Sequence, residues 1–309
     1  MRRGHRVRAM VLYNSFSSWG WLEALPPDVM SAVDVQLGDV RDVNSVRDLA
    51  EGCDVVYHLA ALIAIPYSYR TPRSYIETNV IGTMNVMEAA RQLGTPRVVH
   101  TSTSEVYGTA RTVPITEDHP LQGQSPYSAS KIGADKVAES YHLSFGVSVA
   151  TLRPFNTYGP RQSARAVIPT VAAQLLAGSR EVHVGDLRPT RDFSYVEDTA
   201  RAFMALGDAP AEAVVGKVFN SGTGIEISIG ELIDLLGEVT GRDLAVIQDD
   251  DRMRPPTSEV MRLVCGSERI QATTGWRPQV QLRDGLARTV EWLARPANLD
   301  RYKWGQYNV

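Results

Sequence analysis

The chain has 309 residues, a formal net charge of −3 at pH 7, 43% hydrophobic residues and 22% charged residues. This composition allows a large buried core, and the length suits one large α/β unit or two linked domains. The near balance of 32 basic and 35 acidic residues gives no basic field, so we expect no nucleic-acid partner. No apolar run approaches about 18 residues, and no secretion signal opens the chain. We therefore expect a cytoplasmic protein without a membrane segment.

The two cysteines, Cys53 and Cys265, lie far apart in the sequence and outside any metal-ligand spacing. Paired or clustered cysteines would be needed for a structural disulfide framework or a zinc site. We therefore expect ordinary thiols in a reducing compartment and no metal.

The first half of the chain alternates short β-branched runs with longer helical patterns. Strands are predicted at residues 6–14, 33–39, 54–61, 97–108 and 147–159, and helices at residues 74–94 and 126–146. Such alternation is typical of an α/β fold with a doubly wound parallel sheet, a Rossmann domain, covered by helices on both faces. Ligands of these sheets bind at the carboxyl ends of the strands, where polar residues are found here.

The rhythm changes after about residue 160. A helix is predicted at residues 166–179, short strands at 181–186 and 217–224, and a further helix at 227–241, before a proline-rich stretch at 252–260. We predict a Rossmann domain over residues 1–160, rejoined by about residues 190–222. Residues 161–309 would then form mainly a smaller α+β substrate domain.

One expected element is absent from the opening of the sequence. A dinucleotide-binding domain begins with a strand, a glycine-rich turn and a helix that binds the pyrophosphate. Neither G-x-G-x-x-G nor G-x-x-G-x-x-G occurs in the first 50 residues, and the opening resembles the end of a first helix running into a second strand. Compared with a complete dinucleotide-binding domain, the predicted elements thus lack roughly the first 20 residues. We expect weak cofactor binding and poor stability, and favour a start codon placed too far downstream.

The residue pair with the clearest chemistry is Tyr127 and Lys131 in SPYSASK. Their i, i+4 spacing places both side chains on one helix face, where an ammonium group can lower the pKa of a phenol and make it a general base. The preceding predicted strand ends in Thr103, Ser104 and Glu105, which bring a hydroxyl and a carboxylate to the same pocket. A chance pair and a solvent-facing Glu105 are the alternatives.

Four segments follow one another along the chain: VVHTSTSEVYG, SPYSASK, LRPFNTYGPRQ and PTRDFSYVED. Together they resemble the extended short-chain dehydrogenase/reductase superfamily, and within it the NAD-dependent epimerase/dehydratase family. The Thr103-x-Glu105 pattern resembles the nucleotide-sugar 4,6-dehydratases. Further segments resemble the N-acetylglucosamine 4,6-dehydratases of legionaminic-acid-type pathways. The resemblance implies that Tyr127 deprotonates the sugar 4-hydroxyl and that Glu105 removes the C5 proton. Ser104 stands where many hexose dehydratases have Asp.

The resemblance also implies binding residues and partners. The cofactor would be a tightly bound NAD, with NADP not excluded. It would contact Asp39, Val40, Leu59, Ala60, Ala61, Tyr127, Lys131 and Pro154. The nucleotide-sugar substrate would contact Asn156, Arg191 and Arg254, whose guanidinium groups suit a diphosphate. Two long helices, residues 74–93 and 126–143, would form a homodimer interface.

Two alternative functions stay open. A 4-epimerase needs only Tyr127, Lys131 and a tightly bound cofactor, and Glu105 argues against it. A non-catalytic protein that keeps the fold is the second alternative. Trp19 and Trp21 fit either a cover over the adenine or ordinary packing, whereas His58 and His100 lie in strand-like runs and are predicted core residues.

Overall fold

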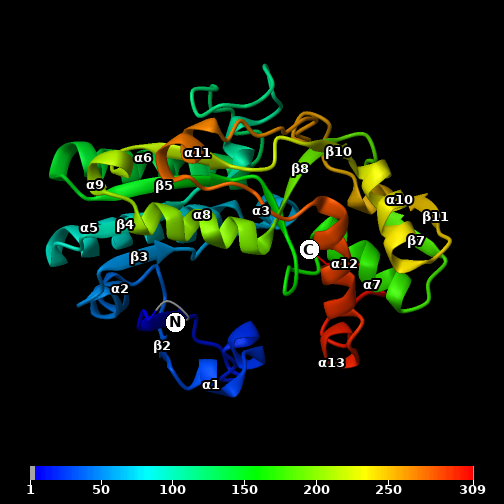
Figure 1. Cartoon of the computed structure of the whole chain (residues 1–309), viewed down its shortest axis with the longest axis horizontal. Helices are drawn as coiled ribbons and strands as arrows, with labels where there is room; N and C mark the ends of the chain where they lie inside the picture. Colours follow the sequence, from blue (N-terminus) through cyan, green and yellow to red (C-terminus); the bar gives the residue numbers. More distant parts are fainter. Residues whose placement is uncertain (1–3, 309) are drawn as a thin grey trace.

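The computed structural model describes residues 4–308. Its N-terminal part is built on parallel strands, seen on the left of Figure 1. A four-stranded parallel sheet has the order β3-β4-β5-β9, and β1 pairs with β2 in a separate parallel pair. These strands are β1 (Val7–Val11), β2 (Val33–Leu37), β3 (Val55–His58), β4 (Arg97–Thr101), β5 (Val149–Pro154) and β9 (Val218–Ser221). Among residues 4–308, no strand joins β1 or β2 to β3.

Helices cover both faces of the four-stranded sheet because successive residues of a strand point to opposite faces. On β4, Val98 packs with α5 and α6, whereas Val99 packs with α8. The neighbouring strand β5 repeats this alternation with Val149 and Ala150. The helices concerned are α2 (Val43–Ala50), α5 (Gly82–Leu93), α6 (Pro126–Phe145), α8 (Val196–Asp208) and α11 (Glu268–Thr274). The predicted α/β fold with a parallel sheet and two helical layers is confirmed.

The predicted helix at residues 74–94 is one continuous helical stretch made of three pieces. It contains a wider π-helical turn in its middle, followed by a regular helix that ends at a left-handed Gly94. The pieces are α4 (Pro72–Tyr75), η2 (Ile76–Ile81) and α5, and α3 (Ile65–Arg70) precedes them. Asn79, within the π-helical turn, is buried and points toward α6.

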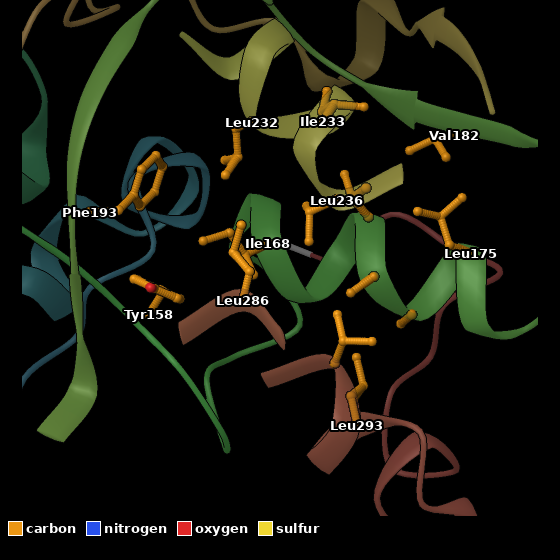
Figure 2. Close-up of a cluster of buried hydrophobic side chains, with 14 of the residues drawn as sticks. Tyr158, Ile168, Leu175, Val182, Phe193, Leu232, Ile233, Leu236, Leu286 and Leu293 are labelled. Atoms are coloured by element: carbon orange, nitrogen blue, oxygen red, sulfur yellow. The ribbon is translucent and has the colours of Figure 1, made fainter. Parts of the chain in front are cut away.

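The C-terminal unit, on the right of Figure 1, has its own apolar core. Leu175, Leu236 and Leu293 come from three different helices and meet in this core, as Figure 2 shows. Its elements are α7 (Val167–Leu176), β7 (Glu181–Val184), α10 (Ile229–Thr240), β11 (Ala245–Gln248) and α12 (Leu282–Leu293). The parallel pair β7–β11 covers one side of the core. A capping box between Ser228 and Glu231 begins α10.

A small three-stranded sheet lies between the two units. Its order is β10-β8-β6, formed by β6 (Asn156–Tyr158), β8 (Thr190–Tyr195) and β10 (Glu226–Ser228). Within residues 190–222, therefore, α8 and β9 pack with the Rossmann sheet, whereas β8 pairs outside it. The remaining short elements are η1 (Gly20–Ala24), α1 (Pro27–Met30), η3 (Ser104–Tyr107), α9 (Ala211–Val214), η4 (Asp250–Arg252) and α13 (Pro296–Leu299).

In the part of the chain that the structure describes, no helix combines the length and apolar character needed to cross a membrane. The same residues contain no group of three or more His, Cys, Asp or Glu side chains arranged to bind a metal ion. Cys53 and Cys265 are both free thiols.

Gly285 permits the close approach of α12 to the three-stranded sheet. A Cβ atom at this position would overlap the hydroxyl of Tyr158, a fully buried and rigid side chain that donates a hydrogen bond to the carbonyl of Leu282 (3.1 Å). We expect Gly285→Ala to lower the free energy of unfolding by about 1–3 kcal/mol, because the overlap forces α12 away from its core. Urea unfolding of the variant measures this change.

Gly230 in α10 provides the matched control. A Cβ atom there would meet Leu187 at 3.8 Å, which is ordinary van der Waals contact. Gly230→Ala should leave stability unchanged or raise it by up to about 1 kcal/mol, because alanine favours the helix. Equal stability of Gly285→Ala and the parent chain would contradict the packing described here.

Candidate active site

The first two turns of α6 carry Tyr127 and Lys131 at the carboxyl edge of the sheet. The helix begins at a capping box, in which Ser125 Oγ accepts from the Ser128 N–H (3.1 Å) and Ser128 Oγ accepts from the Ser125 N–H (2.9 Å). Pro126 occupies the first turn, where its missing N–H leaves no hydrogen bond unmade. The sequence thus fixes where α6 starts and places Tyr127 on its first turn and Lys131 one turn later, on the same face.

The segment after β4 brings a hydroxyl and a carboxylate to the same place. Thr103 caps the short helix η3, its Oγ1 accepting from the Glu105 N–H (3.2 Å), and both side chains are buried. The Thr103 side chain is hydrogen-bonded to Tyr127, and the charge of Glu105 acts on Tyr127. Ser104 is buried beside them. The structure therefore brings the predicted catalytic residues of η3 and α6 together.

The protonation of Tyr127 differs from the sequence-based expectation. Burial raises the pKa of Tyr127 above its ordinary value, and the charge of Glu105 adds to this rise, while the hydrogen bond with Thr103 opposes it. Lys131 Nζ instead donates to the carbonyl of Thr101 (2.5 Å), and burial lowers the pKa of Lys131 to about 8. The expectation that Lys131 lowers the pKa of this phenol is corrected, because desolvation dominates at this depth.

Beneath Lys131 lies a buried polar network centred on Asp135, one turn further along α6. Its Oδ1 lies 3.1 Å from His100 Nε2, and its Oδ2 accepts from Ser102 Oγ (2.8 Å) and from Arg153 (2.8 and 3.1 Å). Burial alone would raise the pKa of Asp135, but the hydrogen bonds from His100 and Ser102 and the charge of Arg153 lower it to about 2. The network ties α6 to β4 and β5.

The two histidines of the strand runs are core residues, as predicted. His58 and His100 are buried with ring centroids 5.6 Å apart, and burial lowers the pKa of each. His58 Nε2 pairs with Thr83 Oγ1 at 2.9 Å.

The residues predicted to contact a dinucleotide lie along the carboxyl edges of β2, β3 and β5. Leu59 is 61% exposed at the end of β3, and Ala60 and Ala61 follow it. Asp39 is paired with Arg41, which lowers the pKa of Asp39, while Val40 is buried and its carbonyl accepts from Asn85. Pro154 ends β5.

Of these residues, Asp39 and Val40 are predicted to contact the adenine of a dinucleotide, and Leu59, Ala60 and Ala61 its nicotinamide side. An ammonium group has three N–H donors, and Lys131 uses one in its hydrogen bond to the carbonyl of Thr101. Two donors remain for the ribose hydroxyls of a dinucleotide. The connection from β1 to β2 runs through η1 and α1 rather than through a glycine-rich turn. The expectation that the missing glycine-rich turn weakens cofactor binding stays a prediction.

Sequence reasoning missed Asn79, which positions the loop after β3. Its Nδ2 donates to Ser130 Oγ (2.9 Å) and to the carbonyl of Leu62 (2.9 Å), and its Oδ1 accepts from the Leu62 N–H (2.9 Å). Asn79 thus fixes the loop containing Ala60 and Ala61 relative to α6. The signal that could have revealed it is its helical spacing with Tyr75, Thr83 and Met87, which places Asn79 on the buried face of this helical stretch.

The predicted substrate residues come from β6, β8 and the segment after η4. Asn156 lies on β6, and its buried Oδ1 has no hydrogen-bond partner among the described residues. Arg191 on β8 is buried and donates to Glu259 Oε1 (3.1 Å), and Arg254 donates to the same oxygen (3.2 Å). Glu259, missed from the sequence, lies in the same RPPTSEV segment as Arg254.

The charge of Arg191 connects this side with the catalytic side. Burial lowers the pKa of Arg191, and the charge of Glu105 is the main influence opposing that shift. The carboxylate predicted to take part in catalysis and the guanidinium predicted to bind substrate therefore share one buried region.

The tryptophans near the N-terminus are placed differently from each other. Trp21 packs against Trp292 of α12 at 5.3 Å between ring centroids, and against Tyr302 at 6.3 Å. Trp19 is 39% exposed. For Trp21, the structure therefore supports packing, which is the second of the two predicted roles.

Comparison with known proteins identifies the family. A family model described as GDP-mannose 4,6 dehydratase matches residues 1–289. The chain belongs to the NAD-dependent epimerase/dehydratase family. It is 38% identical to a dTDP-glucose 4,6-dehydratase of Streptomyces griseus over 256 residues, which cover 82% of this chain and 76% of that protein.

Other members of the epimerase/dehydratase family are similar at a comparable level. A UDP-glucose 4-epimerase of Mycolicibacterium smegmatis is 35% identical over 260 residues, covering 82% of this chain and 80% of that protein. A dTDP-glucose 4,6-dehydratase from Streptomyces venezuelae, solved with NAD bound, superposes with a TM-score of 0.84 at 30% identity, covering 98% and 91% of the two chains. Both dehydratases and epimerases of this family therefore resemble the chain.

The Asp135 network generates a stability prediction. We expect Asp135→Asn to lower the free energy of unfolding by about 3–5 kcal/mol near neutral pH, because it leaves the Arg153 guanidinium buried without its counter-charge. The folded-state pKa of Asp135, about 2, lies below its ordinary value of 3.8, so its contribution is complete above pH 3.8 and is lost as the pH falls toward 2. Urea unfolding at several pH values measures both effects.

The exposed pair between Arg8 and Asp34 (3.0 Å) supplies a control. Asp34→Asn removes a carboxylate from an Asp–Arg pair at the surface and should cost less than about 1 kcal/mol. Similar losses for Asp34→Asn and Asp135→Asn would show that the buried network does not stabilise the fold as described.

Proposed function

We propose that the chain is a nucleotide-sugar 4,6-dehydratase that acts with tightly bound NAD, and that its substrate is an N-acetylglucosamine nucleotide. The observation that carries the proposal is the buried carboxylate of Glu105, held by η3 beside Thr103 and Tyr127. A dehydratase needs a carboxylate at the sugar ring in addition to the tyrosine, whereas redox chemistry at one carbon does not. Two relatives named above as dTDP-glucose 4,6-dehydratases support the reaction class.

The site residues would divide the proton transfers of the reaction. Tyr127, oriented by Thr103, takes the proton of the sugar 4-hydroxyl as that carbon is oxidised to a ketone. A nicotinamide held beside Tyr127 and Lys131 would supply the redox chemistry, namely reversible hydride exchange with the sugar and no net oxidation. The 4-ketone acidifies the C5 proton, which Glu105 removes as water leaves from C6. As hydride returns to C6, C5 regains a proton, which balances the proton that Tyr127 took from the 4-hydroxyl. The product is a 4-keto-6-deoxy sugar.

The raised pKa of Tyr127 opposes this role, because burial stabilises the protonated phenol and a protonated phenol cannot accept the proton of the 4-hydroxyl. The proposal therefore requires that bound cofactor and substrate change the surroundings of Tyr127 and lower its pKa. Ser104 offers no carboxyl group to protonate the leaving hydroxyl. Glu105 would therefore handle both proton transfers, giving the proton it took from C5 to the departing water.

A 4-epimerase is the second candidate, favoured by the similarity to the UDP-glucose 4-epimerase of M. smegmatis. An epimerase would use Tyr127 and Lys131 and would have no role for a buried carboxylate at the sugar ring. Glu105 is buried and electrostatically linked to both Tyr127 and Arg191, so its position favours dehydration.

The mass of the product tests the proposal. The chain is incubated with UDP- or GDP-N-acetylglucosamine and NAD or NADP, and mass spectrometry follows the sugar nucleotide. We expect a product lighter by about 18 Da, the mass of one water, and expect Glu105→Gln to slow its formation by a factor of about 10²–10⁴ because the proton acceptor is lost.

Glu117→Gln is the matched control. This second buried carboxyl accepts a hydrogen bond from the Asn220 N–H (2.8 Å), and burial raises its pKa, so an amide replaces it at little cost. Dehydration should persist in Glu117→Gln. A product of unchanged mass would establish the epimerase instead, and the absence of any turnover with each nucleotide and cofactor would favour the non-catalytic alternative.

We further propose that the chain forms a homodimer through the face made by η2, α5 and α6. Three apolar side chains on this face are exposed in the single chain: Ile76 (46%), Met84 (38%) and Leu143 (76%). Solvent-exposed apolar side chains gathered on neighbouring long helices are typical of an association surface.

Light scattering after size-exclusion chromatography tests this proposal. The parent chain should have about twice its 34.0 kDa mass, and Met84→Glu should shift it toward the monomer, because a buried charge without a partner opposes association. Ile247→Glu changes a side chain of similar exposure (37%) on β11 and should leave the dimer intact. A monomeric parent chain would contradict the proposal.

A further inference from the structure

The C-terminal tail after α12 turns back onto the molecule. Tyr302 anchors it, because this side chain is buried and its hydroxyl donates to the carbonyl of Gln162 (2.7 Å). The Tyr302 ring also packs near Trp21 and Trp292. The tail follows residues 1–289, the part of the chain that the family model matches. The residues after Tyr302 therefore start from a fixed point.

Tyr307, near the end of this tail, lies against Arg252. Its half-buried ring is 4.8 Å from the guanidinium carbon of Arg252, which is cation–π contact. Burial raises the pKa of Tyr307, and the charges of Arg252, Arg254 and Arg70 oppose this rise. Asp249 is the acidic group that acts on the phenol. Three guanidinium groups from α3, η4 and the segment after η4 thus approach one phenol.

These arginines continue into the predicted substrate site. Arg254 shares the Glu259 oxygen with Arg191, which connects the tail with the residue predicted to bind the diphosphate. We call Arg70, Arg191, Arg252 and Arg254 the arginine cluster. Two carboxylates pair with it, Glu259 and Asp249, the second at 3.2 Å from Arg252.

Four guanidinium groups against three carboxylates, Glu259, Asp249 and the Glu105 whose charge acts on Arg191, leave a formal charge of +1 on this group of residues. The diphosphate of a nucleotide sugar carries about two negative charges, which would complement that excess. The Tyr307 hydroxyl lies near these cations and can donate a hydrogen bond to a phosphate oxygen. The guanidinium groups offer only N–H donors, so this hydroxyl would add an O–H donor.

We propose that the C-terminal tail forms part of the substrate site and that Tyr307 is a binding residue for the diphosphate of the nucleotide sugar. This inference rests on the proposed function, because it assumes a nucleoside diphosphate at the arginine cluster. The ring of Tyr307 holds Arg252 in place, and its hydroxyl contacts the phosphates. Tyr307 thus contributes to substrate affinity and takes no part in proton transfer at the sugar.

Calorimetric titration of the chain, in the presence of NAD, with dTDP, UDP and GDP tests the inference without depending on turnover. We expect Tyr307→Phe to raise the Kd of whichever of these nucleotides the parent binds by about tenfold, because a hydrogen bond to a charged group is lost. Tyr307→Ala should raise it at least as much, since the contact with Arg252 is lost as well. Each variant should keep the thermal unfolding midpoint of the parent measured without nucleotide.

Trp304→Ala is the control within the same tail. Trp304 is 46% exposed, and it should be replaceable without a change in Kd. Equal affinity of the parent and both Tyr307 variants would overturn the tail inference while leaving the proposed function intact. A parent chain that binds none of the three nucleotides would overturn both. If the parent binds more than one of the nucleotides, a loss confined to one of them would overturn the assignment of Tyr307 to the diphosphate. An equal loss in Trp304→Ala would overturn it in every case.

Discussion

The arrangement of the catalytic residues depends on one buried carboxylate, Asp135. It accepts hydrogen bonds from Arg153 and Ser102 and lies within hydrogen-bonding distance of His100, so a single side chain of α6 joins the ends of two neighbouring strands. A buried charge is tolerated only when its partners compensate for the lost hydration, and here they come from separate elements. The position of α6 relative to β4 and β5 is therefore determined by polar geometry as well as by apolar packing.

The network around Asp135 also positions Lys131 and Tyr127, because these residues lie one and two turns before Asp135 on the same helix. Tyr127, Lys131 and Asp135 are spaced by four residues, so one face of α6 carries all three. With Asp135 held between the strands, Lys131 meets the carbonyl at the end of β4 and Tyr127 meets Thr103 just beyond it. The same partners that lower the pKa of Asp135 thus fix the face on which the chemistry is proposed to occur.

Much of this arrangement could be predicted from the sequence, where the signal is local. The alternation of strands and helices predicted the parallel sheet, and the spacing of Tyr127 and Lys131 placed them on one helix face. The environment of these groups depends on tertiary packing and could not be predicted: burial reverses the expected shift in the pKa of Tyr127. Asn79 and Glu259 were missed because each acts through residues distant in sequence or through a shared partner.

The substrate side of the site follows from the cost of burying Arg191. A guanidinium does not lose its proton in proteins, so burial must be compensated by nearby carboxylates. Glu105 of η3 and Glu259 of the segment after η4 provide that compensation. The segment that contains Glu259 also bonds to Gln124, just before α6. The buried arginine therefore helps to hold η3, β8 and the segment after η4 together, at the place where the sugar and its diphosphate are proposed to meet.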